Sequence, residues 1–334
     1  MKLDWKLVLL VTLSLGLMVS CESDDEEMGT FEDLSATMLS LGKDLPTMLD
    51  PIGGYSWVVS AASVQDPDDA TAVAGFTVLD IRADTAFARG HIKDAINTNL
   101  TDILTVASEN TGPFLVVCYT GQSAGHGVMA LRLTGYEASV LKWGFSGWNS
   151  AFSQKWDNNA GHENGNKIEG VDNWVYDASP SIGSYEYPDW ESEDTEGEAI
   201  LATRIQSTLE AGFKSASATG LLGDPASMQI INYWGEPHYT EFGHFNGAIQ
   251  YNTITLAEDM VKAIDADVET AIYCYTGQTS SMVTFWLNVL GYNAKSVGFG
   301  VNTLNFDAME TSFEGTTNYK KLWHGSADFP YVTN

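Results

Sequence analysis

Two of the three cysteines in this 334-residue chain lie in the same five-letter string, Cys-Tyr-Thr-Gly-Gln. Cys118 and Cys274 each follow a short apolar run and precede a glycine-bearing turn and a segment with helical spacing. A cysteine between a buried strand and the N-terminus of a helix faces free backbone N–H groups, which favour an anion. Such an environment lowers the pKa of a thiol, and the thiolate is the nucleophilic form. The sequence therefore predicts two nucleophilic cysteines.

The predicted anion cradle spans six residues in each copy. Gly121 and Gly277 allow the tight curl of the loop, and the hydroxyls of Ser123 and Thr279 are expected to donate to the sulfur. The remaining loop residues form a neutral rim, which consists of Tyr119, Thr120 and Gln122 in the first copy and Tyr275, Thr276 and Gln278 in the second. The alternative is that both cysteines are buried structural thiols, since free cysteine is among the most buried residue types.

The sequence around the cysteines is duplicated. Three landmarks recur at a nearly constant offset: Gly90-His91-Ile92 as Gly243-His244-Phe245, Cys118 as Cys274, and Gly135-Tyr136 as Gly291-Tyr292. A constant offset across different residue types indicates a duplicated domain of about a hundred residues rather than a short-repeat solenoid.

Apolar strands alternate with helices in both copies. The first copy predicts strands at 57–59, 76–80, 114–117 and 138–141 and a helix at 123–133; the second predicts strands at 230–231, 271–273 and 294–297 and a helix at 281–290. Apolar runs without polar alternation indicate strands of a buried parallel sheet. We therefore expect an α/β fold with two domains, each a parallel sheet flanked by helices.

The first 21 residues have the pattern of an export signal. Lys2 and Lys6 precede an apolar run at 7–19 that is short for a membrane span. The run ends in Met-Val-Ser-Cys, which resembles the lipobox of bacterial lipoproteins and implies that Cys21 carries lipid. The alternative is an ordinary cleaved signal. We expect an exported, lipid-anchored protein, with the outer membrane or the cell surface as candidate locations.

The net charge of the chain limits its possible partners, and its compartment bears on whether the thiols are oxidised. The chain has 44 acidic and 16 basic residues and a net charge of −28. Nucleic acids and anionic lipid surfaces should repel it, so we expect no nucleic-acid partner and membrane contact through the lipid only. Disulfides can persist outside the cell, but Cys118 and Cys274 end separate strands in separate domains, so we expect both to be free.

The loop string Cys-x-x-Gly-x-Ser/Thr, about thirty residues after Gly-His-Ile/Phe, resembles the active-site loop of rhodanese-type sulfurtransferases. Residues 78–100 are similar to the family's Asp-x-Arg…Gly-His-Ile-x-Gly-Ala segment, and residues 143–149 to its closing Gly-Gly-x-x-x-Trp motif. With the export signal and the linker composition, we expect a lipoprotein signal peptide at 1–21, an acidic tether and lead-in at 22–54, a first rhodanese-like domain at 55–155, a linker at 156–199 and a second rhodanese-like domain at 200–334.

The resemblance implies a transferase that moves sulfane sulfur from a donor such as thiosulfate to a thiol or cyanide-like acceptor. The carrier is a cysteine persulfide, and neither a metal nor an organic cofactor is required. Ala124 and Ser280 stand where phosphatases with a Cys-x5-Arg loop need arginine, which argues against that class. The alternative function is a non-catalytic, rhodanese-like binding or persulfide-sensing module on the membrane surface.

The resemblance also assigns supporting residues to the first loop. Asp80 and Arg82 match the family's Asp-x-Arg pair, which braces the loop from the neighbouring strand end. The second copy has Asn232 and Trp234 at these places. Because support of this kind usually decides how well a reactive group performs, we expect the first cysteine to react at least as fast as the second.

Three histidines are secondary candidates. His91 and His244 are expected to support the strand entry near each site without taking part in the chemistry. His238 falls near a position at which relatives often hold a substrate-contacting residue. None of the six histidines has metal-ligand spacing, so we expect no metal site.

Overall fold

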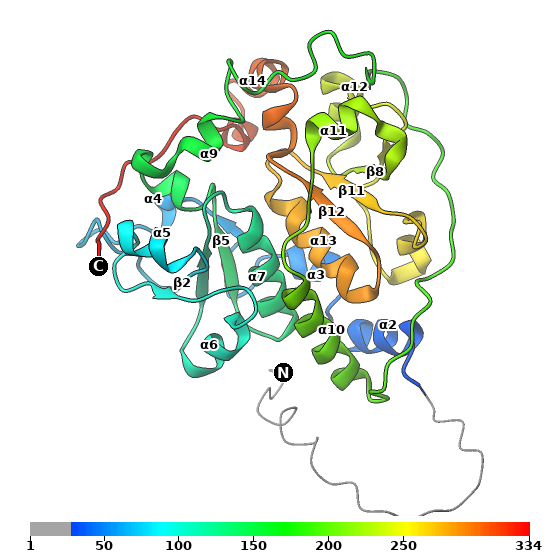
Figure 1. Cartoon of the computed structure of the whole chain (residues 1–334), viewed down its shortest axis with the longest axis horizontal. Helices are drawn as coiled ribbons and strands as arrows, with labels where there is room; N and C mark the ends of the chain where they lie inside the picture. The colour runs from blue at the N-terminus through cyan, green and yellow to red at the C-terminus, as the bar shows by residue number, and fades with distance from the viewer. Residues whose placement is uncertain (1–27) are drawn as a thin grey trace, which may run out of the picture.

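The computed structural model describes residues 28–334, so the export signal and Cys21 lie outside the described residues. Two five-stranded parallel sheets stand side by side (Figure 1). The first sheet has the order β1 (Val58–Val59), β5 (Ala138–Leu141), β4 (Phe114–Val117), β2 (Thr77–Asp80), β3 (Ile96–Asn97). The second has the order β10 (Ile249–Gln250), β8 (Gln229–Asn232), β11 (Thr270–Tyr273), β12 (Ala294–Val297), β7 (Ser215–Ala216).

The two sheets have the same topology when the second is read from β7 to β10. The predicted parallel α/β architecture is confirmed, and the strands that the apolar runs predict are present. Three edge strands, β3, β7 and β10, were not predicted. Each has two residues, which is too short to produce a recognisable hydrophobic run.

Helices flank both sheets. In the first unit they are α4 (Ala61–Val64), α5 (Asp84–Arg89), α6 (Ile103–Glu109), α7 (Gln122–Leu133) and α8 (Phe145–Trp148). In the second they are α10 (Gly197–Ala211), α11 (Ala218–Gly223), α12 (Glu236–Phe242), α13 (Gln278–Leu290) and α14 (Phe306–Phe313). Short 3₁₀ turns complete this unit: η2 (Pro225–Ser227), η3 (Ala257–Ala263), η4 (Gly300–Thr303) and η5 (Thr317–Lys321).

The two units share one hydrophobic core. Helices α7 and α13 pack directly against each other in the middle of the molecule (Figure 1), and both are buried along almost their whole length. Gly125 permits this approach, because a Cβ atom there would lie 2.8 Å from Ser281 Oγ. The hydroxyl of Ser281 in turn donates to the Gln122 carbonyl at 2.5 Å. The units therefore form a fixed pair.

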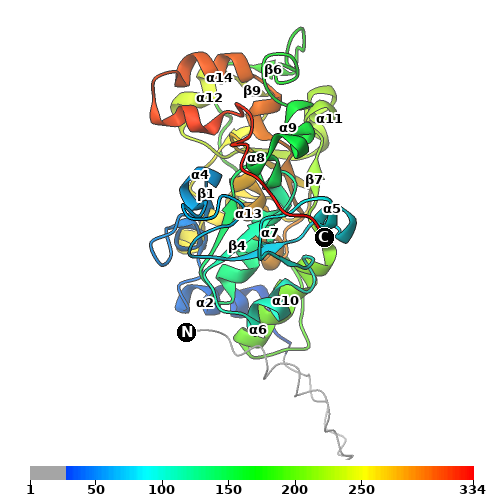
Figure 2. The same cartoon turned by 90° about the vertical axis from the view of Figure 1, so that its left-hand side faces the viewer.

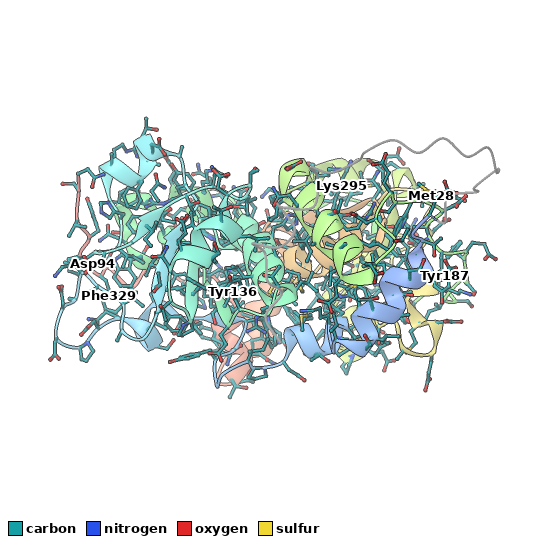
Figure 3. All side chains as sticks on the ribbon, turned by 90° about the horizontal axis from the view of Figure 1, so that it is seen from below. Met28, Asp94, Tyr136, Tyr187, Lys295 and Phe329 are labelled. Carbon is teal, nitrogen blue, oxygen red and sulfur yellow. The ribbon has the colours of Figure 1, made fainter. Side chains whose placement is uncertain are left out.

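The described part of the predicted tether and lead-in, residues 28–54, contains two helices. Helices α2 (Phe31–Ser40) and α3 (Leu45–Leu49) bury apolar side chains in the shared core, and α2 packs on α10. The segment between the units also packs here, since Tyr187 stacks on Phe31 with 4.3 Å between ring centroids (Figure 3). The apolar faces of these two helices explain why the segment packs on the core.

The connection between the units contains η1 (Ser150–Phe152), α9 (Gln154–Asp157) and β6 (Trp174–Val175). Strand β6 pairs antiparallel with β9 (His244–Phe245). The Trp190 indole donates to the Leu290 carbonyl at 2.9 Å. The aromatic residues of this stretch therefore anchor it to the second unit.

The C-terminal segment returns to the first unit, so 200–334 is not one continuous domain. It runs past α8 to α5 (Figure 2), and Phe329 lies at the same end of the molecule as Asp94 (Figure 3). The His91 N–H donates to the Val332 carbonyl at 2.9 Å, and the Trp148 indole donates to the Pro330 carbonyl at 2.8 Å. Within residues 28–334, no helix has both the length and the apolar character that crossing a bilayer requires.

Candidate active site

Cys118 begins the loop that joins the central strand β4 to helix α7. Its Sγ atom accepts hydrogen bonds from the backbone N–H groups of Gly121, at 3.1 Å, and Ala124, at 3.4 Å. Gly121 has a φ of 78°, which glycine adopts without the strain that a side chain would impose. The side chain of Cys118 is buried, and its thiol is free. The loop thus forms an N–H cradle around the sulfur.

Cys274 occupies the equivalent place between β11 and α13. Its Sγ accepts from the N–H groups of Gly277 at 3.2 Å and Ser280 at 3.4 Å. Gly277 has a φ of 76°. This thiol is also buried and free. Both predicted loops therefore adopt the same conformation, which can stabilise a negative charge on sulfur.

The structure does not place the predicted hydroxyl groups at the sulfur atoms. In the second copy, the hydroxyl near the sulfur belongs to the next residue in the chain. Neither Ser123 nor Thr279 bonds the cysteine; instead Ser280 Oγ lies 3.4 Å from Cys274 Sγ and 2.8 Å from Ser296 Oγ. The first turn of α13 turns the sixth residue after the cysteine toward the sulfur. The first copy has Ala124 at that position, so only the Cys274 cradle has a hydroxyl beside the sulfur.

A glycine closes over each loop from the segment after the following strand. The Phe145 N–H donates to the Cys118 carbonyl at 2.7 Å, and the Val301 N–H donates to the Cys274 carbonyl at 3.1 Å. A Cβ atom at Gly144 or at Gly300 would overlap those carbonyl oxygens. Both glycines also have a positive φ, so the position requires glycine for space and for conformation.

Asp80 and Arg82 brace the first loop from the side, as predicted. They form a buried ion pair with 2.5 Å between Arg82 Nη2 and Asp80 Oδ2, and the same Nη2 donates to the Gly90 carbonyl at 2.8 Å. The guanidinium carbon lies 3.9 Å from the ring centroid of Phe145 and 5.6 Å from that of Tyr119. Arg82 therefore supports the loop through aromatic side chains and does not touch the sulfur.

Aromatic stacking replaces this ion pair in the second copy. The Asn232 amide donates to the Tyr273 hydroxyl at 2.8 Å. The Trp234 ring stacks on Tyr275, with 5.2 Å between ring centroids. Because Tyr275 directly follows the cysteine, the stack supports the second loop where Arg82 supports the first.

His91 and His244 hold the preceding helices and lie away from the sulfur contacts. His91 Nδ1 lies 2.9 Å from the Phe87 carbonyl oxygen. His244 Nδ1 lies 3.2 Å from the Tyr239 carbonyl oxygen, and its Nε2 lies 3.0 Å from Asp177 Oδ1. Burial lowers the pKa of His244, while the hydrogen bonds to Tyr239 and Asp177 oppose this effect. Both histidines thus support the fold around the sites.

A cavity of about 600 Å³ opens at Cys274. Residues of the second cysteine loop line it, and so do residues of the β1 segment of the first unit, including Trp57 and Val59. Lys142, Lys320 and Lys321 also line it, and no acidic side chain of the described part of the chain does. The site is therefore built by both units and is basic within a strongly acidic protein.

The three lysines influence one another. The Lys142 ammonium donates to the Lys320 carbonyl. Burial, together with the positive charges of Lys320 and Lys321, lowers the pKa of Lys142 to about 8. Burial also lowers the pKa of Lys321, and the negative charge of a Cys274 thiolate acts in the opposite direction. Lys321 is thus electrostatically coupled to the sulfur.

Lys321 and His238 both contact Tyr275. The Lys321 ammonium lies 4.0 Å from the centroid of the Tyr275 ring, and His238 Nδ1 lies 2.5 Å from its hydroxyl oxygen. Burial is the main cause of a lowered pKa at His238. His238 therefore reaches the second site through Tyr275.

Tryptophans pack beside the first loop. The Trp156 indole donates to the Thr120 carbonyl at 3.2 Å, and its ring packs against Trp143 and Trp323. The Lys155 ammonium lies 4.5 Å from the Tyr119 ring centroid. The first loop contributes no residue to the 600 Å³ cavity. The two similar loops thus have different surroundings.

The loops are also connected across the interface. The Gln278 amide donates to the Thr120 carbonyl at 3.2 Å, and the Phe299 N–H donates to Gln122 Oε1 at 3.0 Å. Each glutamine begins the helix of one unit and bonds the loop region of the other. The sequence placed these glutamines on the substrate rim, whereas Gln122 joins the units and only Gln278 lines the cavity.

Sequence reasoning missed Ser280 and the three lysines. The only signal for the lysines was their presence in a chain poor in basic residues. Nothing in the sequence related Lys142 or Lys320 to Cys274, because the three residues belong to separate segments that meet only in the folded molecule.

Comparison with known proteins identifies part of the chain. Residues 60–151 match the family model described as Rhodanese-like domain. The chain is similar at low identity to a rhodanese-related protein from Thermoplasma volcanium, with 18% identity and a TM-score of 0.24 over 29% of this chain and 91% of that one.

Two longer solved structures are similar over more of the chain. A thiosulfate sulfurtransferase from Pseudomonas aeruginosa has 15% identity and a TM-score of 0.27 over 82% of this chain and 46% of that one. A 3-mercaptopyruvate sulfurtransferase from Leishmania major has 13% identity and a TM-score of 0.26 over 77% of this chain and 75% of that one. The matched segment, 60–151, contains the Asp80–Arg82 pair and the Cys118 loop and is similar to a rhodanese-like domain.

Proposed function

We propose that the protein is a sulfurtransferase that carries sulfane sulfur as a persulfide on Cys274. The observation that carries this proposal is the N–H cradle of Cys274 at the floor of a lysine-lined cavity. The rhodanese-like domain at 60–151 supports the same reaction class. A donor such as thiosulfate is a small anion, which the lysines would attract.

The first half-reaction needs only the cysteine and its surroundings. The Cys274 thiolate attacks the outer sulfur of thiosulfate, an S–S bond forms to the enzyme, and the original S–S bond breaks with its electron pair leaving on sulfite. The N–H groups of Gly277 and Ser280 stabilise the charge before and after transfer, in the way of an oxyanion hole. A thiophilic acceptor then removes the outer sulfur and restores the thiolate.

Cys274 is preferred over Cys118, contrary to the expectation from the Asp80–Arg82 pair. That pair braces its loop, but no residue of that loop lines the cavity, whereas the Cys274 loop lines the cavity and has the Ser280 hydroxyl beside its sulfur. Room for a substrate at the sulfur supports this order, because a nucleophile must come within about 3 to 3.5 Å of the atom it attacks.

The test compares single cysteine variants. Thiosulfate should leave one added sulfur atom, seen by intact mass, on the Cys118→Ser protein, and that variant should retain turnover with cyanide as acceptor. The Cys274→Ser protein should lose most of its turnover. The reverse pattern would assign the reaction to the first loop. Absence of both persulfide and turnover in the unsubstituted protein would reject the sulfurtransferase function and favour the non-catalytic binding or sensing module.

A further inference from the structure

The cavity at Cys274 is much larger than an inorganic sulfur anion needs. Its volume is about 600 Å³. One water molecule occupies about 30 Å³ of liquid, and cavities of roughly 300–1,000 Å³ hold organic ligands of considerable size. A five-atom ion such as thiosulfate would therefore leave most of the cavity to solvent. The cavity therefore has room for a larger occupant.

The walls of the cavity indicate the chemistry of that occupant. Trp57, Val58 and Val59 provide an apolar surface on the side of the first unit. Ser60 and Ser63 follow this apolar segment in the chain and also line the cavity. A wall of this kind accommodates a short carbon chain, which a purely inorganic substrate does not have.

The lysines indicate the charge of the occupant. Three of the sixteen basic residues of the chain line this one cavity, and none of the acidic residues at positions 28–334 does. Lys321 lies over the ring of Tyr275, next to the reactive cysteine, while the Lys142 ammonium donates to the backbone carbonyl of Lys320. The positive charges of Lys320 and Lys321 act on Lys142, and an anion with more than one negative group relieves this repulsion.

We propose that the acceptor at Cys274 is an organic thiol that carries at least two carboxylates, an inference that rests on the proposed function. Its carboxylates pair with Lys142 and Lys320, and its carbon chain lies along Trp57 to Val59. Its thiolate attacks the outer sulfur of the Cys274 persulfide. The new S–S bond forms on the acceptor, the bond to Cys274 Sγ breaks, and the electron pair returns to the Sγ atom in its cradle. The product is the acceptor persulfide.

The experiment measures sulfur transfer from the persulfide protein to thiols of graded charge. The protein is loaded with thiosulfate, freed of excess donor and mixed with 2-mercaptosuccinate, 3-mercaptopropionate, 2-mercaptoethanol or cysteamine. Second-order rates are divided by the thiolate fraction of each compound at the assay pH. We expect the dicarboxylate to react at least about tenfold faster than the neutral thiol, and the cationic thiol to react slowest.

Charge variants locate the effect. Lys142→Gln and Lys320→Gln should each lower the ratio of the mercaptosuccinate rate to the mercaptoethanol rate by about fivefold. Lys295→Gln is the matched control, because Lys295 pairs with Glu269 outside the cavity and its removal should leave the ratio unchanged. Circular dichroism verifies that each variant is folded.

The steric variant Ser63→Trp tests the volume. It should lower the ratio of mercaptosuccinate turnover to cyanide turnover, since cyanide needs little space. Equal rates for all thiols, or a dicarboxylate preference that survives both lysine substitutions, would overturn the inference while leaving the sulfurtransferase function intact. Failure to form a persulfide at all would instead reject the proposed function.

Discussion

Lys142 changes its charge within the pH range of ordinary assays. Burial, with the nearby charges of Lys320 and Lys321, lowers its pKa from 10.5 to about 8. A lysine is positive below its pKa and neutral above it, so the cavity has its full charge below about pH 8 and loses one charge as the pH rises through that value. At the residue scale, substrate binding should therefore depend on pH even when the substrate does not titrate.

We predict that the KM for thiosulfate rises between about pH 7 and pH 9.5, by roughly fivefold, because an ion pair is lost. Thiosulfate keeps both negative charges in this range. The Lys142→Arg variant, whose guanidinium stays charged, should show a flatter profile. Steady-state kinetics across this range measures the effect. A KM that does not vary in the unsubstituted protein would contradict the assignment of Lys142 to the binding site.

At the element scale, each reactive loop depends on a second segment that closes over it. Gly144 contacts the Cys118 loop, and Gly300 contacts the Cys274 loop, both at positive φ. The two positions are equivalent in the duplicated fold and carry the same steric restriction. Substitutions at these glycines therefore form a matched pair that separates the role of a loop in folding from its role in turnover.

We predict that Gly144→Ala and Gly300→Ala lower the free energy of unfolding by similar amounts, about 1–3 kcal/mol, because each forces a backbone shift against a buried loop. Only Gly300→Ala should also reduce kcat strongly, by about tenfold or more, since it displaces the Cys274 cradle. Urea unfolding and thiosulfate turnover distinguish the two effects. Equal losses of kcat in both variants would mean that both loops take part in turnover.

At the scale of the whole molecule, the second site is completed by the first unit. The cavity combines the β1 segment and Lys142 with the Cys274 loop and the lysines of η5. The shared core and the packed helices α7 and α13 hold these parts together. After η5, the C-terminal segment crosses back to the first unit and forms hydrogen bonds with it. Neither unit alone contains the complete site.

We propose that Cys21, which precedes the described residues, carries a lipid that anchors the protein to a membrane on the exported side. The Met-Val-Ser-Cys sequence supports this. The Cys21→Ser variant should move from the membrane fraction to the soluble fraction, whereas the Cys118→Ser variant should stay with the membrane. Fractionation followed by immunoblotting measures this. Unchanged membrane retention after Cys21→Ser would reject lipid anchoring through this residue.

The local features of both sites could be predicted from the sequence alone. The apolar runs of β4 and β11, the following glycines and the helices α7 and α13 predicted two equivalent cysteine cradles, and the duplication predicted two similar sheets. These features depend on interactions between residues close together in the chain, such as the bonds from Gly121 and Gly277 to sulfur. The Asp80–Arg82 pair, two residues apart, belongs to the same category.

The tertiary structure placed a lysine-lined cavity at Cys274, and this is why we propose Cys274 rather than Cys118 as the sulfur carrier. Trp156 packs beside the Cys118 loop, while Lys142 and Lys320 reach the Cys274 cavity from distant parts of the chain. The loops themselves are nearly identical in sequence, so no local pattern distinguishes them. The position of the cavity and of its lysines depends on how α7 packs on α13 and on where the C-terminal segment runs. Both arrangements arise only when the whole chain buries its shared core.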